Sequence, residues 1–264
     1  MTKSQQATSQ RRYQAPALDK GLDILEYLAS EGISLTQTEI ARGLDRGTNE
    51  LFRILVTLER RGYIQRDPAS GAYALTLRLF ELGHTHSPYR ALLRAATRPM
   101  QTLSETVLES CHLSVLQRGK LLIIAQEESP RPLRFSTEVG SIFPVIHTAS
   151  DRLLLAHCPP DEQDDLLAHD EDFQPLSKTK QQELLKQLAT IRERGFEQAY
   201  SEVTEGVNVI AVLVGAPEGV IHAALTIPAL GRALGRRQAP QQAALLHALQ
   251  DCAAEISKAA GLVE

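Results

Sequence analysis

The sequence of 264 residues has few cysteines, no tryptophan and no long apolar run. Its three cysteines are odd in number and far apart, which argues against a disulfide framework or a four-cysteine zinc module and favours a reducing cytoplasm. The apolar run Val209–Ala216 is far too short to cross a bilayer, so an integral membrane protein is excluded. The polar segment Met1–Gln14 lacks the apolar core of a secretory signal. We therefore expect a cytoplasmic protein.

The chain also lacks an overall basic charge. Its formal net charge is −4 and its pI is near 6.1, which excludes a nucleic-acid binder that is basic throughout. However, residues 1–83 carry a net charge of +1 whereas the remainder carries −5, and residues 46–66 hold five arginines against two glutamates. A local basic stretch of this kind is typical of a protein that contacts phosphates with one small part, although a solvated surface produces the same pattern.

Helix signals begin after a polar segment, residues 1–15, that we expect to be a disordered tail. Leucines spaced three and four apart predict a helix from Leu18 to about Gly32. The sequence Thr36–Glu39 is a capping box, in which the threonine side chain and the glutamate side chain each bond the other residue's backbone. The helix that it opens is short because Gly43 ends it.

A third helix and a hairpin complete this series. The third helix has an apolar face that includes Leu51 and Leu55, and Gly62 ends it. Two short strands, residues 63–66 and 72–75, follow and are joined by a turn that contains proline and glycine. Helix, short helix, turn, helix and hairpin in this order predict a winged helix-turn-helix over residues 16–83.

The rest of the chain predicts a linker helix and a mixed α+β domain. Residues 84–108 carry an apolar stripe, with Ser87 as the N-cap and Pro99 as a kink or break. Beyond them, strand-like runs alternate with amphipathic segments in residues 109–264, which predicts an antiparallel or mixed sheet with helices. The strands are expected near 113–117, 121–125, 209–214 and 220–227, and the helices near 150–157, 161–168, 178–194 and 241–260.

Several segments of this chain resemble the IclR family of bacterial transcription regulators, over about residues 18–262. The matching segments are 18–25, 51–64, 66–68 with 73–75, 78–83, 147–150 and 205–207. The resemblance implies an α+β protein with an N-terminal winged helix-turn-helix, a linker helix and a C-terminal GAF-like α/β effector domain. It also implies a homodimer or dimer of dimers that binds double-stranded operator DNA, with a cleft for a small metabolite that is often an organic acid.

The third helix is the expected recognition helix, because such a helix buries one face and presents the other to base edges. Asn49 is suited to adenine and Arg53 to guanine or a phosphate, unless Arg53 forms a surface salt bridge. Glu50 departs from the family's usual small hydroxyl residue, so it either reads a base or is masked by an arginine. The candidate DNA-binding residues are Thr36, Arg46, Thr48, Asn49, Glu50, Arg53, Arg61, Arg66, Ser70 and Gly71.

The helix expected from Ser150 follows an extended segment, so its free N–H groups and helix dipole favour a bound carboxylate. The resemblance places the effector pocket here, with candidate residues Phe143, Ile146, Thr148, Ala149, Ser150, Val207, Val209 and Thr226. Asp151 stands where the family often has glycine, and Val209 where some members have cysteine. A carboxylate at Asp151 can cap the helix itself and compete with an anionic ligand, which favours an effector with an amine or hydroxyl groups.

The sequence contains none of the common catalytic or cofactor-binding motifs. No nucleophile elbow, phosphate-binding loop or dinucleotide fingerprint is present, so we expect no catalytic residues, no cofactor and no metal. We interpret His84 and His86 as solvated linker histidines. The expected function is a ligand-responsive DNA-binding regulator. Two alternatives remain: a metabolite-binding protein or enzyme whose helical module serves protein contacts, and a constitutive DNA binder with an inactive sensor pocket.

Overall fold

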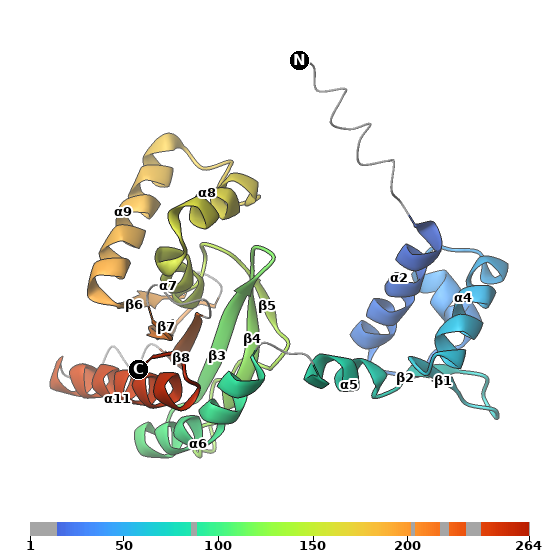
Figure 1. Ribbon diagram of the computed structural model, residues 1–264, viewed down its shortest axis with the longest axis horizontal. Helices are drawn as coiled ribbons and strands as arrows, with labels where there is room; N and C mark the ends of the chain where they lie inside the picture. The colour runs from blue at the N-terminus through green and yellow to red at the C-terminus, as the bar shows by residue number, and fades with distance from the viewer. Residues whose placement is uncertain (1–14, 86–88, 202–203, 217–221, 231–238, 264) are drawn as a thin grey trace. The chain divides into compact units, whose positions relative to one another are not determined.

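The computed structural model describes residues 15–85, 89–201, 204–216, 222–230 and 239–263. The chain divides into two compact units, residues 1–87 and residues 88–264 (Figure 1). The expected tail lies outside the described residues except for Ala15. The segment expected to form a separate linker, residues 84–108, is divided at the boundary between the units, and its helix packs into the second unit. No helix in the described ranges is long and apolar enough to span a membrane.

The first unit contains four helices and a two-stranded hairpin in its described part. Its elements are α2 (Pro16–Glu31), α3 (Gln37–Gly43), α4 (Thr48–Arg60), β1 (Ile64–Arg66), β2 (Tyr73–Leu75) and α5 (Arg78–Thr85). Left-handed glycines follow the helices as the sequence predicts: Gly32, with φ 64°, caps α2, and Gly62, with φ 77°, follows α4. β1 and β2 pair antiparallel, which gives the predicted wing.

The core of this unit fixes which face of α4 is free. Leu51 and Leu55 are fully buried against α2 and α3, and the side chains of Ile54 and Leu58 are partly buried beside them. Burial of this stripe stabilises the helix in its position, since each large aliphatic side chain contributes about 1.5–3 kcal/mol when buried. The predicted buried face of the third helix is therefore confirmed, and the opposite face is exposed.

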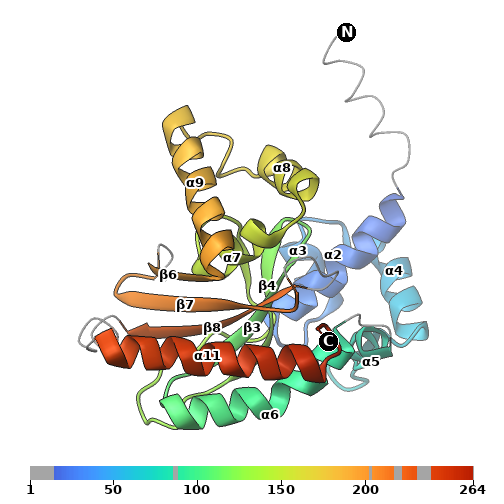
Figure 2. The ribbon, with the colours of Figure 1, turned by 60° about the vertical axis from the view of Figure 1, so that its left-hand side comes forward.

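The second unit is built on a six-stranded antiparallel sheet with strand order β5-β4-β3-β8-β7-β6. The strands are β3 (Cys111–Gln117), β4 (Lys120–Glu127), β5 (Ile142–Pro144), β6 (Phe196–Tyr200), β7 (Val207–Val214) and β8 (Ala223–Leu230). The helices are α6 (Arg90–Val107), α7 (Ala149–His157), α8 (Pro160–His169), α9 (Lys178–Arg194) and α11 (Ala239–Ala259). α6 and α11 cover one face of the sheet and α7 and α9 the other, so two apolar cores lie on its two sides (Figure 2).

Two local predictions differ from the structure, and a third is not tested. The predicted N-cap, Ser87, lies outside the described residues, and the described part of α6 begins at Arg90 after Tyr89. A kink or a break was predicted at Pro99, and of these the break does not occur, because α6 runs continuously through this buried residue. Packing of α6 against the sheet and α11 offsets the backbone hydrogen bond that proline cannot donate. β8 begins at Ala223 rather than residue 220, and residues 217–221 of the expected hairpin lie outside the described ranges.

Candidate DNA-binding and effector sites

The exposed face of α4 carries the polar side chains expected of a recognition helix. Thr48, Asn49 and Arg53 are all exposed. The N-cap residue is Gly47, which has no side chain to bond the first-turn N–H groups, so these groups are available to a phosphate. Within the part of the chain that the structure describes, Arg53 forms no ion pair, so the alternative of a salt bridge to Glu50 or Glu59 is not realised.

Glu50 has a different partner from those expected. Its carboxylate pairs with the Nζ of Lys20 on α2, and this hydrogen bond lowers the pKa of Glu50 below its usual value. Arg46 lies nearby but approaches Asp23, with 3.9 Å between Arg46 Nη2 and Asp23 Oδ2. Glu50 is therefore partly masked by an ion pair with α2 rather than by an arginine, and its contact with a base stays a prediction.

Thr36 also has a structural role. Its hydroxyl donates to Glu39 Oε2 at 2.7 Å and accepts from the Glu39 N–H at 3.4 Å, which confirms the capping box. The hydroxyl is thus engaged, and the Glu39 carboxylate beside it repels a phosphate. Thr36 therefore caps α3, and its contact with DNA stays a prediction.

The candidate DNA-binding residues of the wing form hydrogen bonds within the turn between β1 and β2. Arg66 Nε donates to the Gly71 carbonyl oxygen at 3.3 Å, and the Arg66 guanidinium lies 5.6 Å from the ring centre of Tyr73. Ser70 Oγ donates to Asp67 Oδ2 at 2.6 Å, and this bond lowers the pKa of Asp67. The turn between β1 and β2 is therefore stiffened by the same residues that the sequence assigned to DNA contact.

A groove of about 600 Å³ lies between α2, α4 and α5. Its wall is mostly apolar and includes leucines that are unusually exposed, Leu18 at 61% and Leu22 at 46%. Arg53 and Arg61 also line it, and Arg61 is the C-cap residue of α4. Arg61 is thus placed at the groove, at the end of the helix opposite its N-terminus.

A second, smaller pocket of about 70 Å³ lies in the second unit. It is lined by His112, Leu121, Ile123, Phe135, Thr137, Phe143, Thr148, Ser150, Ser201, Thr204, Val207, Val209 and Pro228. Five of the eight predicted ligand-binding residues are among these. Of the other three, Ile146 and Ala149 are buried in the apolar core, and Thr226 lies behind the wall with its Oγ1 2.9 Å from Ser150 Oγ. The pocket combines several hydroxyl groups with an apolar surface, as metabolite sites do. Its volume is well below the roughly 300–1,000 Å³ of usual ligand pockets, so its walls must move apart to admit a metabolite.

The N-terminus of α7 at this pocket is capped from within. The Thr148 backbone N–H and its hydroxyl each donate to Asp151 Oδ2 at 2.7 Å, and the Asp151 N–H donates to the Thr148 hydroxyl at 3.2 Å. Thr148 is therefore the N-cap and Asp151 completes a capping box, so the carboxylate bonds the cap residue rather than the first-turn N–H groups. Asp151 is fully buried, and burial raises the pKa of its carboxyl group to about 7. Its Oδ1 has no hydrogen-bond partner among the described residues.

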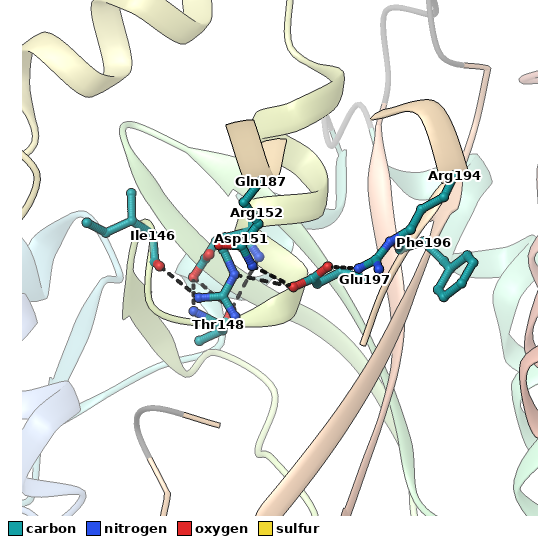
Figure 3. Close-up of polar contacts among 8 residues, drawn as sticks. All are labelled: Ile146, Thr148, Asp151, Arg152, Gln187, Arg194, Phe196 and Glu197. Atoms are coloured by element: carbon teal, nitrogen blue, oxygen red, sulfur yellow. Dashed lines mark hydrogen bonds and ion pairs between the residues drawn. The ribbon is translucent and has the colours of Figure 1, made fainter. Parts of the chain in front are cut away.

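A buried polar network positions this capped turn (Figure 3). Arg152 Nη1 donates to the carbonyl oxygen of Ile146 at 3.1 Å, and Arg152 Nε lies 3.7 Å from Glu197 Oε1. Glu197, on β6, also accepts from Gln187 Nε2 at 3.0 Å and pairs with Arg194. The network therefore ties the turn before α7 to α9 and β6 and fixes one wall of the pocket.

His112 is the pocket residue that sequence reasoning missed. It lies on β3 directly opposite Thr226 of β8, so the two side chains share the sheet face that carries α7. His112 is 6% exposed, and its Nδ1 has no hydrogen-bond partner within the described residues. Burial lowers the pKa of His112 to about 4, so the ring is neutral near pH 7. The sequence signal that could have identified His112 is a histidine within a short, largely apolar strand.

Within the described ranges, no group of three or more histidine, cysteine, aspartate or glutamate side chains is arranged to hold a metal ion.

Family models match both units of the chain. A model of the IclR helix-turn-helix domain matches residues 17–68, and a model of the bacterial transcriptional regulator IclR C-terminal domain matches residues 88–258. The chain belongs to the IclR family.

Relatives of this IclR-family protein include two regulators from Escherichia coli K12. The HTH-type transcriptional regulator KdgR is 30% identical over 230 residues, which span 86% of this chain and 87% of KdgR. The HTH-type transcriptional repressor AllR is 26% identical over 250 residues, which span 94% of this chain and 91% of AllR. This IclR-family protein is accordingly a DNA-binding transcriptional regulator with a C-terminal effector domain.

Solved structures have the same fold. An IclR transcriptional regulator from Alicyclobacillus acidocaldarius is 25% identical, with a TM-score of 0.73 over 94% of this chain and 100% of the other. An IclR homologue from Microbacterium hydrocarbonoxydans in complex with 4-hydroxybenzoate is 22% identical, with a TM-score of 0.77 over 94% of this chain and 100% of the other. The second likeness concerns the fold alone.

Proposed function

We propose that this regulator binds its operator by inserting α4 into the major groove, with the wing on the adjacent backbone. The observation that carries this proposal is the exposed face of α4, where Arg53 has no intramolecular ion pair in the described part of the chain. An exposed guanidinium can bond guanine O6 and N7 in a bidentate manner, and Asn49 can bond adenine N6 and N7. The uncapped N-terminus of α4 adds a phosphate site at the groove edge.

The operator-binding form in this proposal is a homodimer, either alone or in a dimer of dimers. The side of the apolar groove formed by α2 and α5 supports a second copy of the chain as its occupant, which leaves Arg53 on α4 free for DNA. Leu18, Leu22 and Leu82 line this groove with 61%, 46% and 42% of their surfaces exposed, which is unusual for a monomeric surface. A two-fold interface near the recognition helices sets the distance between them and therefore the half-site spacing.

The effector in this proposal is a small metabolite bound between the sheet and α7. Hydroxyl groups from Thr148 and Ser150 and the unpaired Nδ1 of His112 face a partly apolar pocket, which can orient a small ligand that carries hydroxyl groups. A solved homologue of the same fold is in complex with 4-hydroxybenzoate, which supports a small hydroxylated compound as the class of ligand. The Asp151 carboxyl group already completes the capping box of α7, which disfavours a second carboxylate at the same helix end.

Effector binding acts in this proposal by population shift. A ligand that fits one arrangement of the dimer better than another favours that arrangement and changes the affinity for the operator. The chain then works in the cytoplasm as a regulator without catalytic activity, as its relatives' names suggest.

The test has two measurements on the full-length protein. Duplexes selected from a random pool should bind with an affinity that falls steeply with salt concentration. This result would exclude the alternative in which the helix-turn-helix unit serves only protein contacts. A thermal-shift screen at millimolar concentration, starting with 4-hydroxybenzoate and its uncharged relative 4-hydroxybenzyl alcohol, should find a compound that both stabilises the protein and changes operator binding. Absence of sequence-selective binding overturns the regulator mechanism proposed for α4. Operator binding that no stabilising compound alters favours the constitutive alternative.

A further inference from the structure

The recognition helix carries two exposed apolar side chains on the same face as its polar groups. Phe52 is 51% exposed and Val56 is 43% exposed. They are four residues apart on α4, so they lie next to each other on the helix surface. Asn49 and Arg53 flank them on the face opposite the buried Leu51 and share their exposure.

Both residues lie outside the apolar core that the described residues of the first unit form. Phe52 and Val56 are absent from that core and from the wall of the groove between α2, α4 and α5. A single exposed apolar side chain is ordinary, but two adjacent ones among polar side chains form a small patch that a partner can cover.

The surrounding charge indicates which partner this is. Arg53 and Arg60 lie on the same face of α4, and neither has an ion-pair partner in the described residues. The exposed Glu59 lies beside Val56, so these three charged groups together carry a single net positive charge. An apolar protein surface would strip water from these guanidinium groups without pairing them, at a substantial cost. DNA offers phosphates to the arginines and, in its major groove, one apolar group: the C5 methyl of thymine.

We propose that Phe52, with Val56 beside it, contacts the methyl group of a thymine in each operator half-site and makes the regulator specific for thymine there. This inference rests on the proposed insertion of α4 into the major groove. Removing one methyl from such a contact should weaken binding about fourfold, from ~0.8 kcal/mol per buried methylene-sized group and ~1.4 kcal/mol per tenfold in affinity.

The experiment uses uracil, which lacks only the methyl group of thymine. An operator is selected from random duplexes with the full-length protein, and each thymine is then replaced singly by uracil. We expect one position in each half-site at which uracil weakens the wild-type complex about fourfold. Phe52→Ala should bind the thymine operator more weakly and lose the difference between thymine and uracil at that position.

Two further variants separate this contact from general effects. Arg53→Ala, which removes a polar contact on the same helix, should lower affinity but keep the discrimination between thymine and uracil. Phe52→Leu keeps an apolar side chain and should keep part of the discrimination, and it serves as the readout if Phe52→Ala binds too weakly to measure. Far-ultraviolet circular dichroism checks that each variant is folded.

The outcomes are distinct from those for the regulator itself. An operator that binds tightly but shows no uracil-sensitive position, or no thymine at all, overturns the proposal while the regulator function stands. Equal discrimination in wild type and both Phe52 variants also overturns it, because another residue then reads the methyl group. Failure to select any operator counts against the proposed insertion of α4 and removes the basis of the inference.

Discussion

Arg152 Nη1 donates to the carbonyl oxygen of Ile146 at 3.1 Å, across the turn that leads into α7. Ile146 has a φ of 78°, a left-handed conformation that β-branched residues rarely adopt and that the surroundings must hold in place. The same guanidinium faces Glu197, and both side chains are almost completely buried. The turn that presents Thr148 to the pocket therefore depends on a charge partner supplied by a distant strand.

Replacing Arg152 should destabilise the second unit strongly. Arg152→Met leaves the buried carboxylate of Glu197 with fewer partners and the Ile146 carbonyl without its donor, and we expect a loss of about 3–5 kcal/mol in unfolding free energy. The loss should fall at the low end, because Arg194 and Gln187 still contact Glu197. Urea unfolding of the full chain measures it. Arg131, whose side chain is 45% exposed and pairs with Glu109, gives the control: Arg131→Met should cost about 1 kcal/mol at most. Equal losses in the two variants would contradict the role of the buried pair.

Stability should depend on the ionisation of Asp151. Burial raises the pKa of this carboxyl group from 3.8 to about 7 in the folded protein, whereas the Thr148 hydrogen bonds act in the opposite direction. As pH rises, the unfolded chain therefore loses this proton first, and the contribution of Asp151 to stability falls between about pH 4 and pH 7.

Asp151→Asn keeps an oxygen for the Thr148 donors and removes the ionisation. We expect this variant to be more stable than the wild type above about pH 7, by a few kcal/mol at most, and similar to it near about pH 4. Urea unfolding of both proteins across this range provides the measurement. Parallel pH profiles for the two proteins would show that Asp151 does not titrate with a raised pKa.

Local chemistry explains which parts of the fold were predictable. Helix ends depend on a few neighbouring residues, so Thr36 and Gly62 located the limits of α3 and α4 from the sequence. The break allowed for at Pro99 does not occur, because a local rule omits the packing of α6 on the sheet and α11. β6 was not expected, since the short run Phe196–Tyr200 becomes a strand by pairing with β7.

The sites were predictable only where a single segment defines them. Thr148 and Ser150 were chosen because they begin a helix after an extended segment, at the place where the resemblance to the IclR family puts the effector pocket. His112 reaches the same pocket through the register between β3 and β8, which no local pattern specifies. The Lys20 partner of Glu50 likewise depends on how α2 packs against α4. Tertiary pairings of this kind remain hidden in a single sequence.

We expect that His112 lowers the stability of the ligand-free protein and contributes to effector binding. Its Nδ1 is buried without a partner among the described residues, so His112→Phe should stabilise the ligand-free protein by about 1–3 kcal/mol and abolish the thermal shift caused by an effector. His157 is the matched control: it is also buried, but its Nδ1 lies 2.8 Å from the Leu153 carbonyl oxygen, so His157→Phe should destabilise. Thermal unfolding with and without the effector measures both. A less stable His112→Phe protein would indicate a purely structural histidine.

The groove between α2, α4 and α5 should control the oligomeric state. Leu22 is 46% exposed and lines this groove, so Leu22→Glu places a charge in the proposed interface and should give a monomer with reduced operator affinity. Leu133→Glu is the control, because Leu133 is 81% exposed in the other unit and should leave the dimer intact. Analytical ultracentrifugation distinguishes the two. A dimeric Leu22→Glu protein would place the interface elsewhere.

Arg53 and Arg60 share the exposed face of α4 but should differ in what they contact. Arg53 lies one turn from the helix N-terminus, next to Asn49, so we expect a base contact: Arg53→Ala should weaken operator binding by about 1–3 kcal/mol and relax specificity at one position. Arg60, at the far end of the helix, should contact phosphate, so Arg60→Ala should weaken binding to all sequences and reduce the salt slope by about 1. Fluorescence anisotropy over a salt series, with the selected operator and single-base variants, separates the two effects. Unchanged affinity in a folded Arg53→Ala protein would exclude this arginine from the interface and turn the polar face of α4 away from the bases.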